Sequence, residues 1–190
     1  MSEYALFLAI TDHTAAPEPS FSVTSLAVPA DRVGEAERHA AAALAALPPD
    51  TAWPDVEPAL RRRAVDRMRS VPHLAADHVE HDRPEAGAVA CVRDCLADLA
   101  ANSSLTPVAH QPHTVHLTGG HRLPDPATSP LLADALAVHT DRLHPALSRL
   151  TALLGTAARA STTGGLPDDQ DPYDAFDSYT LGGVDGGAGV

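Results

Sequence analysis

The chain has 190 residues, 44% of them hydrophobic and 4% aromatic, so it is long enough to bury a core built mainly from Ala, Leu and Val. All thirteen basic residues are arginine, which excludes a phosphate-loop lysine, a Schiff base and a lysine general base. The net charge of −12 argues against a nucleic-acid binder that relies on a broad basic surface.

The N-terminal quarter predicts a hairpin followed by a helix. Residues 4–10 are continuously apolar, which is typical of a strand covered on both faces. Residues 12–20 contain two prolines and predict a turn, and the β-branched residues of 21–28 predict the second strand. A helix then begins at Pro29 and continues to Leu47, where two prolines end it.

The middle of the chain alternates between predicted helices and short strands. Apolar residues at helical spacing predict a helix over 55–69 and another over 85–101. Residues 73–79 predict a strand between these helices. Two further short strands are predicted over 105–109 and 114–118, and a proline interrupts the first of them.

The last quarter predicts two helices and a tail. Ser129-Pro130 is a typical helix start, and the apolar positions that follow extend this helix to Val138. A leucine seam predicts the last helix over 143–158. From residue 161 on, Gly, Asp, Pro and Ser dominate, so we expect one domain over 1–160 and a disordered acidic tail over 161–190.

The cysteines and the hydropathy indicate a cytoplasmic protein. Cys91 and Cys95 lie four residues apart in a predicted helix, a poor disulfide geometry, so we expect reduced core thiols. The N-terminus lacks a basic leader and a cleavage site. With no apolar run of about twenty residues, we expect no membrane span.

Three segments carry a resemblance to a known family. They are LAITDHT at the end of the first strand, FSVTSLAVPADRV in the hairpin partner, and SPLLADALA late in the chain. In this order they resemble an uncharacterised RNase-H-like family, which has an Asp-Glu-Ser-Gly motif on its first strand and a late Leu-Gln-Leu-Ala-Asp helix motif. Asp12 and Asp134 match the two aspartates, whereas His13-Thr14 replaces Glu-Ser and Leu131-Leu132 lacks the glutamine.

The resemblance implies an RNase-H-like mixed sheet flanked by helices, related to divalent-metal nucleases. Asp12 and Asp134 would be the catalytic residues and the ligands of Mg²⁺ or Mn²⁺. The third ligand would come from the end of the middle strand, where Asp82, Asp77 and Glu80 are candidates. Such metals activate water and stabilise the leaving oxygen of a phosphodiester. A nucleic acid would then bind at this local site. The domain would be either a catalytically active nuclease or a degenerate relative of one.

Both aspartates also have a simpler structural interpretation. Asp12 could be a turn residue that closes a hairpin, and Asp134 could occupy an exposed position on an amphipathic helix.

The alternative function is a non-catalytic adaptor or structural protein. Residues 170–190 place Tyr173, Phe176 and Tyr179 among aspartates, a pattern typical of a linear motif that docks into the groove of a protein partner. An unconstrained terminus explains the same composition.

A histidine cluster offers a separate hypothesis. His110, His113 and His116 occur at steps of three residues, and imidazoles at this density could bind zinc or nickel. Pro112 lies between them, so the three do not share a helical face. Surface histidines in a lysine-free protein are the simpler interpretation.

Overall fold

Five strands and four long helices make up the described chain, which in the computed structural model covers residues 4–13, 15, 17–82, 84–102, 114–118, 136–139 and 143–176. The strands are β1 (Tyr4–Asp12), β2 (Phe21–Pro29), β3 (Ala75–His81), β4 (Thr114–Thr118) and β5 (Leu136–His139). The helices are α1 (Val33–Leu44), α2 (Pro58–Met68), α3 (Ala88–Asn102) and α4 (Pro145–Gly164).

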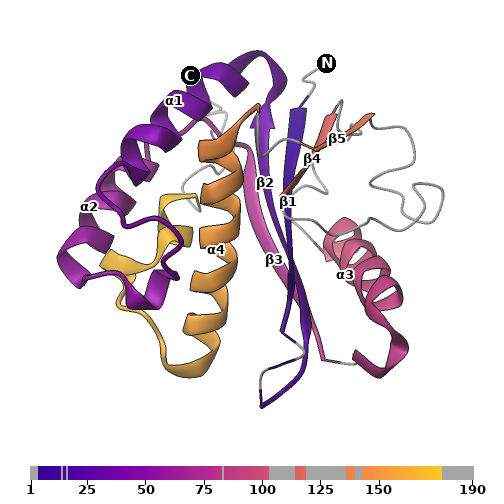
Figure 1. Ribbon diagram of the computed structural model, residues 1–190. Helices are drawn as coiled ribbons and strands as arrows, with labels where there is room; N and C mark the ends of the chain where they lie inside the picture. The colour runs from indigo at the N-terminus through magenta and orange to yellow at the C-terminus, as the bar shows by residue number, and fades with distance from the viewer. Residues whose placement is uncertain are drawn as a thin grey trace, which may run out of the picture.

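The strands form one mixed sheet in the order β3-β2-β1-β4-β5. β2 is antiparallel to both of its neighbours, whereas β1, β4 and β5 are parallel to one another. Figure 1 shows α1, α2 and α4 on one side of the sheet and α3 on the other. The prediction of an α/β protein with a mixed sheet flanked by helices is therefore confirmed.

The central strand β1 is apolar throughout because helices cover both of its faces. Phe7 belongs to the core beneath α1, α2 and α4, and Leu6 and Leu8 belong to the core beneath α3. All three side chains are fully buried. The continuous apolar run predicts that both faces of β1 are buried, because a strand with one solvent-exposed face would alternate apolar and polar residues.

Helix α4 lies unusually close to the sheet at Gly155. A Cβ atom added at this glycine would be 2.7 Å from the Oγ1 atom of Thr24 on β2. Real Cβ atoms do not tolerate such a contact, so the approach of α4 to β2 depends on a residue without a side chain.

Two charged side chains join α4 to α1. The Glu37 carboxylate of α1 accepts hydrogen bonds from the backbone N–H groups of Ala146 (2.8 Å) and Leu147 (2.9 Å), at the N-terminus of α4. Arg149 of α4 donates to the carbonyl of Leu44 (3.5 Å), the last residue of α1, and to that of Leu47 (3.1 Å) in the turn after it. Both charges therefore bind backbone groups at or just beyond a helix end.

The segment that follows α4 packs on the domain, contrary to prediction. The indole Nε1 of buried Trp53 donates to the carbonyl of Gln170 at 2.8 Å, and Phe176 is only 5% exposed. The boundary at residue 160 and the disorder of residues 161–176 are therefore wrong, because these apolar groups complete the core around Trp53. Residues 177–190 lie outside the described residues.

A second correction concerns the helix predicted from Ser129 to Val138. Its end, residues 136–139, is strand β5, paired in parallel with β4 so that Leu136 lies opposite Thr114. An apolar run this short has no distinctive period, and pairing with a neighbouring strand decides its structure. The strand predicted over 105–109 lies outside the described residues.

Candidate functional site

Asp12 occupies the carboxyl end of the central strand. It is the last residue of β1, lies opposite Phe21 of β2, and its side chain is exposed. By the alternation of a strand, Asp12 lies on the same face as Ile10, whose side chain packs in the core beneath α3. The aspartate is thus accessible to solvent at the sheet edge where α/β proteins commonly bind ligands.

Of the other two predicted ligands, Asp82 lies apart from Asp12 in the described chain. Asp82 is exposed and follows the last residue of β3, two strands away from β1. Asp134 lies outside the described residues. Among the described residues, no three His, Cys, Asp or Glu side chains are grouped so that they could hold a metal ion.

A group of polar side chains fills the other face of the sheet near this edge. We name it the β1-end cluster, and its members are His13, Ser20, Ser22, Thr24, His78, Glu80 and Arg159. The register of β2 and β3 builds it, because Ser22 lies opposite Glu80 and Thr24 opposite His78.

The members of the β1-end cluster bind one another. The His13 Nε2 atom lies 3.1 Å from the Ser22 hydroxyl, and the His78 Nδ1 atom lies 2.8 Å from the Thr24 hydroxyl. Ser20 donates to the Glu80 carboxylate. The Nη2 atom of Arg159 on α4 lies 3.9 Å from the same carboxylate. Each member of the cluster therefore has a polar partner within it.

Burial sets the protonation of the two cluster histidines. It lowers the pKa of His78, opposed in part by the nearby Glu80 carboxylate. It also lowers the pKa of His13, together with the Arg159 guanidinium. The His78 Nε2 atom is buried and has no hydrogen-bond partner in the described chain. A neutral ring is the form that such a site favours.

Of the three histidines proposed as a zinc or nickel site, His116 is the one that lies in the described chain. His116 lies on β4 and stacks on Phe7 with ring centroids 4.3 Å apart, while His144 meets it edge-on at 5.4 Å. Burial, and then the neighbouring His144, lowers the pKa of His116 to about 4. His110 and His113 lie outside the described residues.

The two cysteines are buried thiols that form no disulfide, as expected for core thiols. Burial raises the pKa of Cys95 to about 12, and the Cys95 thiol donates to the carbonyl of Phe21 at 3.7 Å. Burial also raises the pKa of Cys91. A thiol in this state is a poor nucleophile, because the reactive form is the thiolate.

The geometry defines an α/β protein with a polar, hydrogen-bonded sheet edge. Comparison of the sequence with models of protein families gives no match, and comparison with curated proteins gives no significant match. None of the helices in the described chain combines the length and hydropathy that crossing a bilayer requires.

Proposed function

We propose that this chain is an RNase-H-like domain whose metal site is degenerate, and that it acts as a non-catalytic binding protein. The β1-end cluster carries the proposal. At the sheet edge where the related nucleases would gather carboxylates, this chain has imidazole and hydroxyl groups that bind one another.

Three features support the RNase-H-like part. The first strand is central in a mixed sheet, it forms an antiparallel hairpin with the second strand, and helices cover both faces. Asp12, which matches the family's leading aspartate, is the last residue of that strand.

The donor set supports degeneracy. A divalent metal such as Mg²⁺ requires several oxygen ligands around one point. Asp12 lies on the α3 face of the sheet, whereas Glu80 lies on the α4 face, in contact with Ser20 and Arg159. His13 stands where the family has glutamate, and its Nε2 atom is engaged by Ser22. The described residues therefore do not fit a two-metal site.

A metal titration tests this proposal. We expect no binding heat for Mn²⁺ or Mg²⁺ in the millimolar range and no rise in melting temperature with either ion, because the described carboxylates do not gather around one point. Cleavage of single- and double-stranded DNA and RNA should not exceed that of the Asp12→Asn/Asp134→Asn variant. A metal-induced rise in melting temperature that both single variants abolish would instead establish an active metal centre.

The binding role is proposed for the chain beyond the packed segment. Phe176 and Tyr173, two of the expected docking aromatics, are packed against the core of their own domain. Docking by residues 170–176 would therefore disrupt this packing. This leaves Tyr179 and its neighbours within 177–190 as the proposed contact to a protein partner, tested by comparing partner binding with and without residues 177–190.

A further inference from the structure

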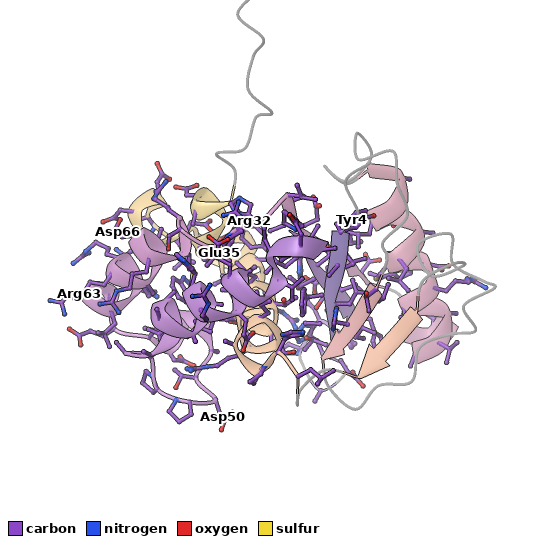
Figure 2. All side chains as sticks on the ribbon, turned by 90° about the horizontal axis from the view of Figure 1, so that it is seen from above. Tyr4, Arg32, Glu35, Asp50, Arg63 and Asp66 are labelled. Atoms are coloured by element: carbon purple, nitrogen blue, oxygen red, sulfur yellow. The ribbon has the colours of Figure 1, made fainter. Side chains whose placement is uncertain are left out.

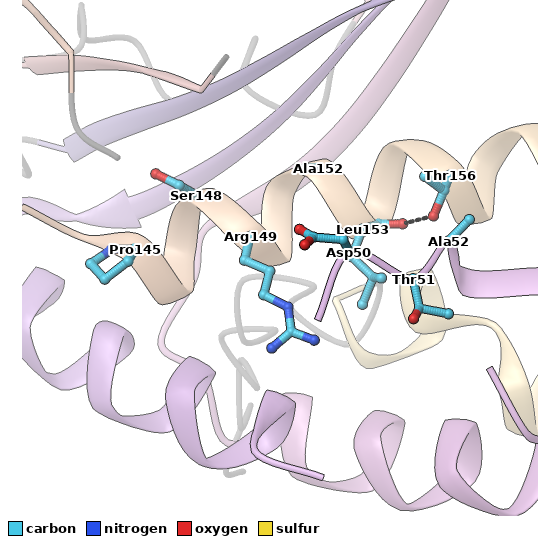
Figure 3. Close-up of a pocket in the computed structure, with 9 residues that line it drawn as sticks. All are labelled: Asp50, Thr51, Ala52, Pro145, Ser148, Arg149, Ala152, Leu153 and Thr156. Carbon is cyan, nitrogen blue, oxygen red and sulfur yellow. Dashed lines mark hydrogen bonds between the residues drawn. The ribbon is translucent and has the colours of Figure 1, made fainter. Parts of the chain in front are cut away.

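A cavity of about 480 Å³ opens beside α4, and none of the residues that line it belongs to the β1-end cluster. Figure 3 shows a stripe of α4 forming one wall and the chain after α1, at Asp50 to Ala52, forming the other. Pro145, Ala152 and Leu153 make the helical wall partly apolar. The volume falls in the range of roughly 300–1,000 Å³ that is typical of small-molecule sites.

Most hydroxyl groups around the cavity are already used by the protein. The Thr51 hydroxyl donates to the carbonyl of Pro49 at 3.2 Å. The Thr156 hydroxyl donates to the carbonyl of Leu153 at 2.8 Å and accepts from the backbone N–H of Trp53 at 2.9 Å. Recognition of a ligand would therefore depend on the charged groups that line the cavity.

The Arg149 guanidinium is only partly used. It donates to the carbonyls of Leu44 (3.5 Å), Leu47 (3.1 Å) and Pro48 (2.7 Å) through its two Nη atoms. Because a guanidinium has five N–H donors, these three bonds leave the Nε hydrogen and one Nη1 hydrogen. Arg149 can therefore hold the end of α1 and still present donors and a positive charge to an anion.

Asp50 places the opposite charge on the same cavity at a conformational cost. Its φ is +55°, in the left-handed region where glycine is the least strained residue. Its carboxylate makes no hydrogen bond or ion pair with the described residues, and the side chain is exposed. Side chains retained at strained positions are concentrated at ligand-binding sites.

We propose that this cavity binds a small zwitterion of the amino-acid type. Asp50 and Arg149 line one cavity without forming an ion pair, so two opposite charges are presented at separate points. The ligand's ammonium group would contact Asp50, its carboxylate would contact Arg149, and its apolar body would lie along Ala152 and Leu153.

Three small molecules with the same apolar body test, on the full chain, whether the cavity binds a zwitterion. They are L-leucine, 3-methylbutylamine, which lacks the carboxylate, and 4-methylpentanoate, which lacks the ammonium. Leucine is expected to raise the melting temperature and to give a measurable Kd by calorimetry, and each single-charge analogue to bind at least about tenfold more weakly. Equal binding of the amine or of the acid would overturn the proposal, as would no effect of leucine at about 50 mM.

Two substitutions at Asp50 distinguish the loss of its negative charge from a loss of protein stability. Asp50→Asn keeps a residue that tolerates positive φ but removes the charge, so leucine binding should weaken at least about tenfold. Asp50→Gly should abolish binding without lowering the melting temperature of the free protein, because the glycine is unstrained at this φ. The matched control is Asp66→Asn, a change of an exposed aspartate on α2, away from the cavity (Figure 2). If Asp66→Asn weakens binding as much as Asp50→Asn, the assignment to the cavity is wrong.

Discussion

Arginine side chains join neighbouring elements of this protein through backbone carbonyl groups. Arg67 of α2 donates to the carbonyl of Ala42 near the end of α1 (3.1 Å), and Arg69 donates to the carbonyl of Asp174 (3.4 Å). Arg149 donates to three carbonyls, one at the end of α1 and two in the turn that follows. A guanidinium offers several donors in a fixed plane, whereas an ammonium is a point charge on a flexible stem, so lysine cannot make the same contacts.

Arg149→Lys should therefore destabilise the fold although the charge is conserved. We expect a loss of about 1–2 kcal/mol in the free energy of unfolding, since carbonyls at the end of α1 lose their donors. Urea denaturation measures the loss. Arg63→Lys is the matched control, because Arg63 is exposed on α2, and it should change the stability by less than about 0.5 kcal/mol. Equal effects in the two variants would show that geometry at Arg149 is unimportant.

His116 should make the protein less stable in acid. Its pKa in the folded state is lowered to about 4, so the folded protein binds this proton less readily than the unfolded chain. Stability should therefore fall as pH decreases from about 6.5 toward 4, because only the unfolded state gains the proton in that window. His116→Gln should show a shallower fall over the same pH range in urea denaturation. If the stability of His116→Gln fell as steeply with decreasing pH as that of the parent, His116 would not be the cause of the acid sensitivity.

At the scale of elements, the position of α4 depends on Gly155. Gly155→Ala would put a methyl group 2.7 Å from the Thr24 hydroxyl, so α4 or Thr24 must shift. We expect a cost of about 1–3 kcal/mol, the usual range for overpacking, and a lower urea midpoint. Thr24 bonds His78, so the shift should also disturb the β1-end cluster.

Gly34→Ala is the matched control for this substitution. Gly34 is also helical, yet a Cβ added there meets no atom within 4 Å. This variant should be stabilised by about 0.5–1 kcal/mol, because alanine has the higher helix propensity. If both alanine variants were stabilised, the close approach of α4 to β2 would not be a constraint.

The sequence predicts elements well where a long period exists and poorly where it does not. The apolar run of β1 and the helical spacing in α3 predict the right structure within a few residues, and the leucine seam predicts α4, which continues to Gly164 and not to residue 158. The four residues of β5 are too short to show a period, and their strand conformation depends on pairing with β4. Residues 166–176 have a composition typical of disorder, but they contribute contacts to a core formed mostly by distant residues.

The candidate site is less predictable than the elements. Asp12 is recognisable because it ends a buried strand. The β1-end cluster is not recognisable, because Ser20 and Glu80 are 60 residues apart and meet only through the register of β2 and β3. The cavity beside α4 likewise combines Asp50 with residues about a hundred positions later, so no local motif marks it.

At the scale of the whole molecule, the segment after α4 closes the helical layer. A chain truncated after Gly165 loses the Gln170 carbonyl that binds Trp53 and the buried Phe176 ring. We expect its melting temperature to fall by about 6 °C or more, because losing a buried aromatic side chain alone costs about 3–5 kcal/mol. A chain truncated after Phe176 keeps all of these contacts and is the reference. Equal melting of the two would show that the segment adds nothing to the core.

The bond between Trp53 and Gln170 joins residues 117 positions apart, and β1 pairs with β4 across more than a hundred residues. During synthesis from the N-terminus, Trp53 must therefore stay without its partner until nearly the entire domain has been made. The hairpin of β1 and β2 can form early, whereas the aromatic centre of the helical layer can close only at the end. Late closure of such long loops is entropically slow. Nascent chains of this protein should thus expose an indole-lined apolar surface for most of their translation, which makes them candidate clients for chaperones.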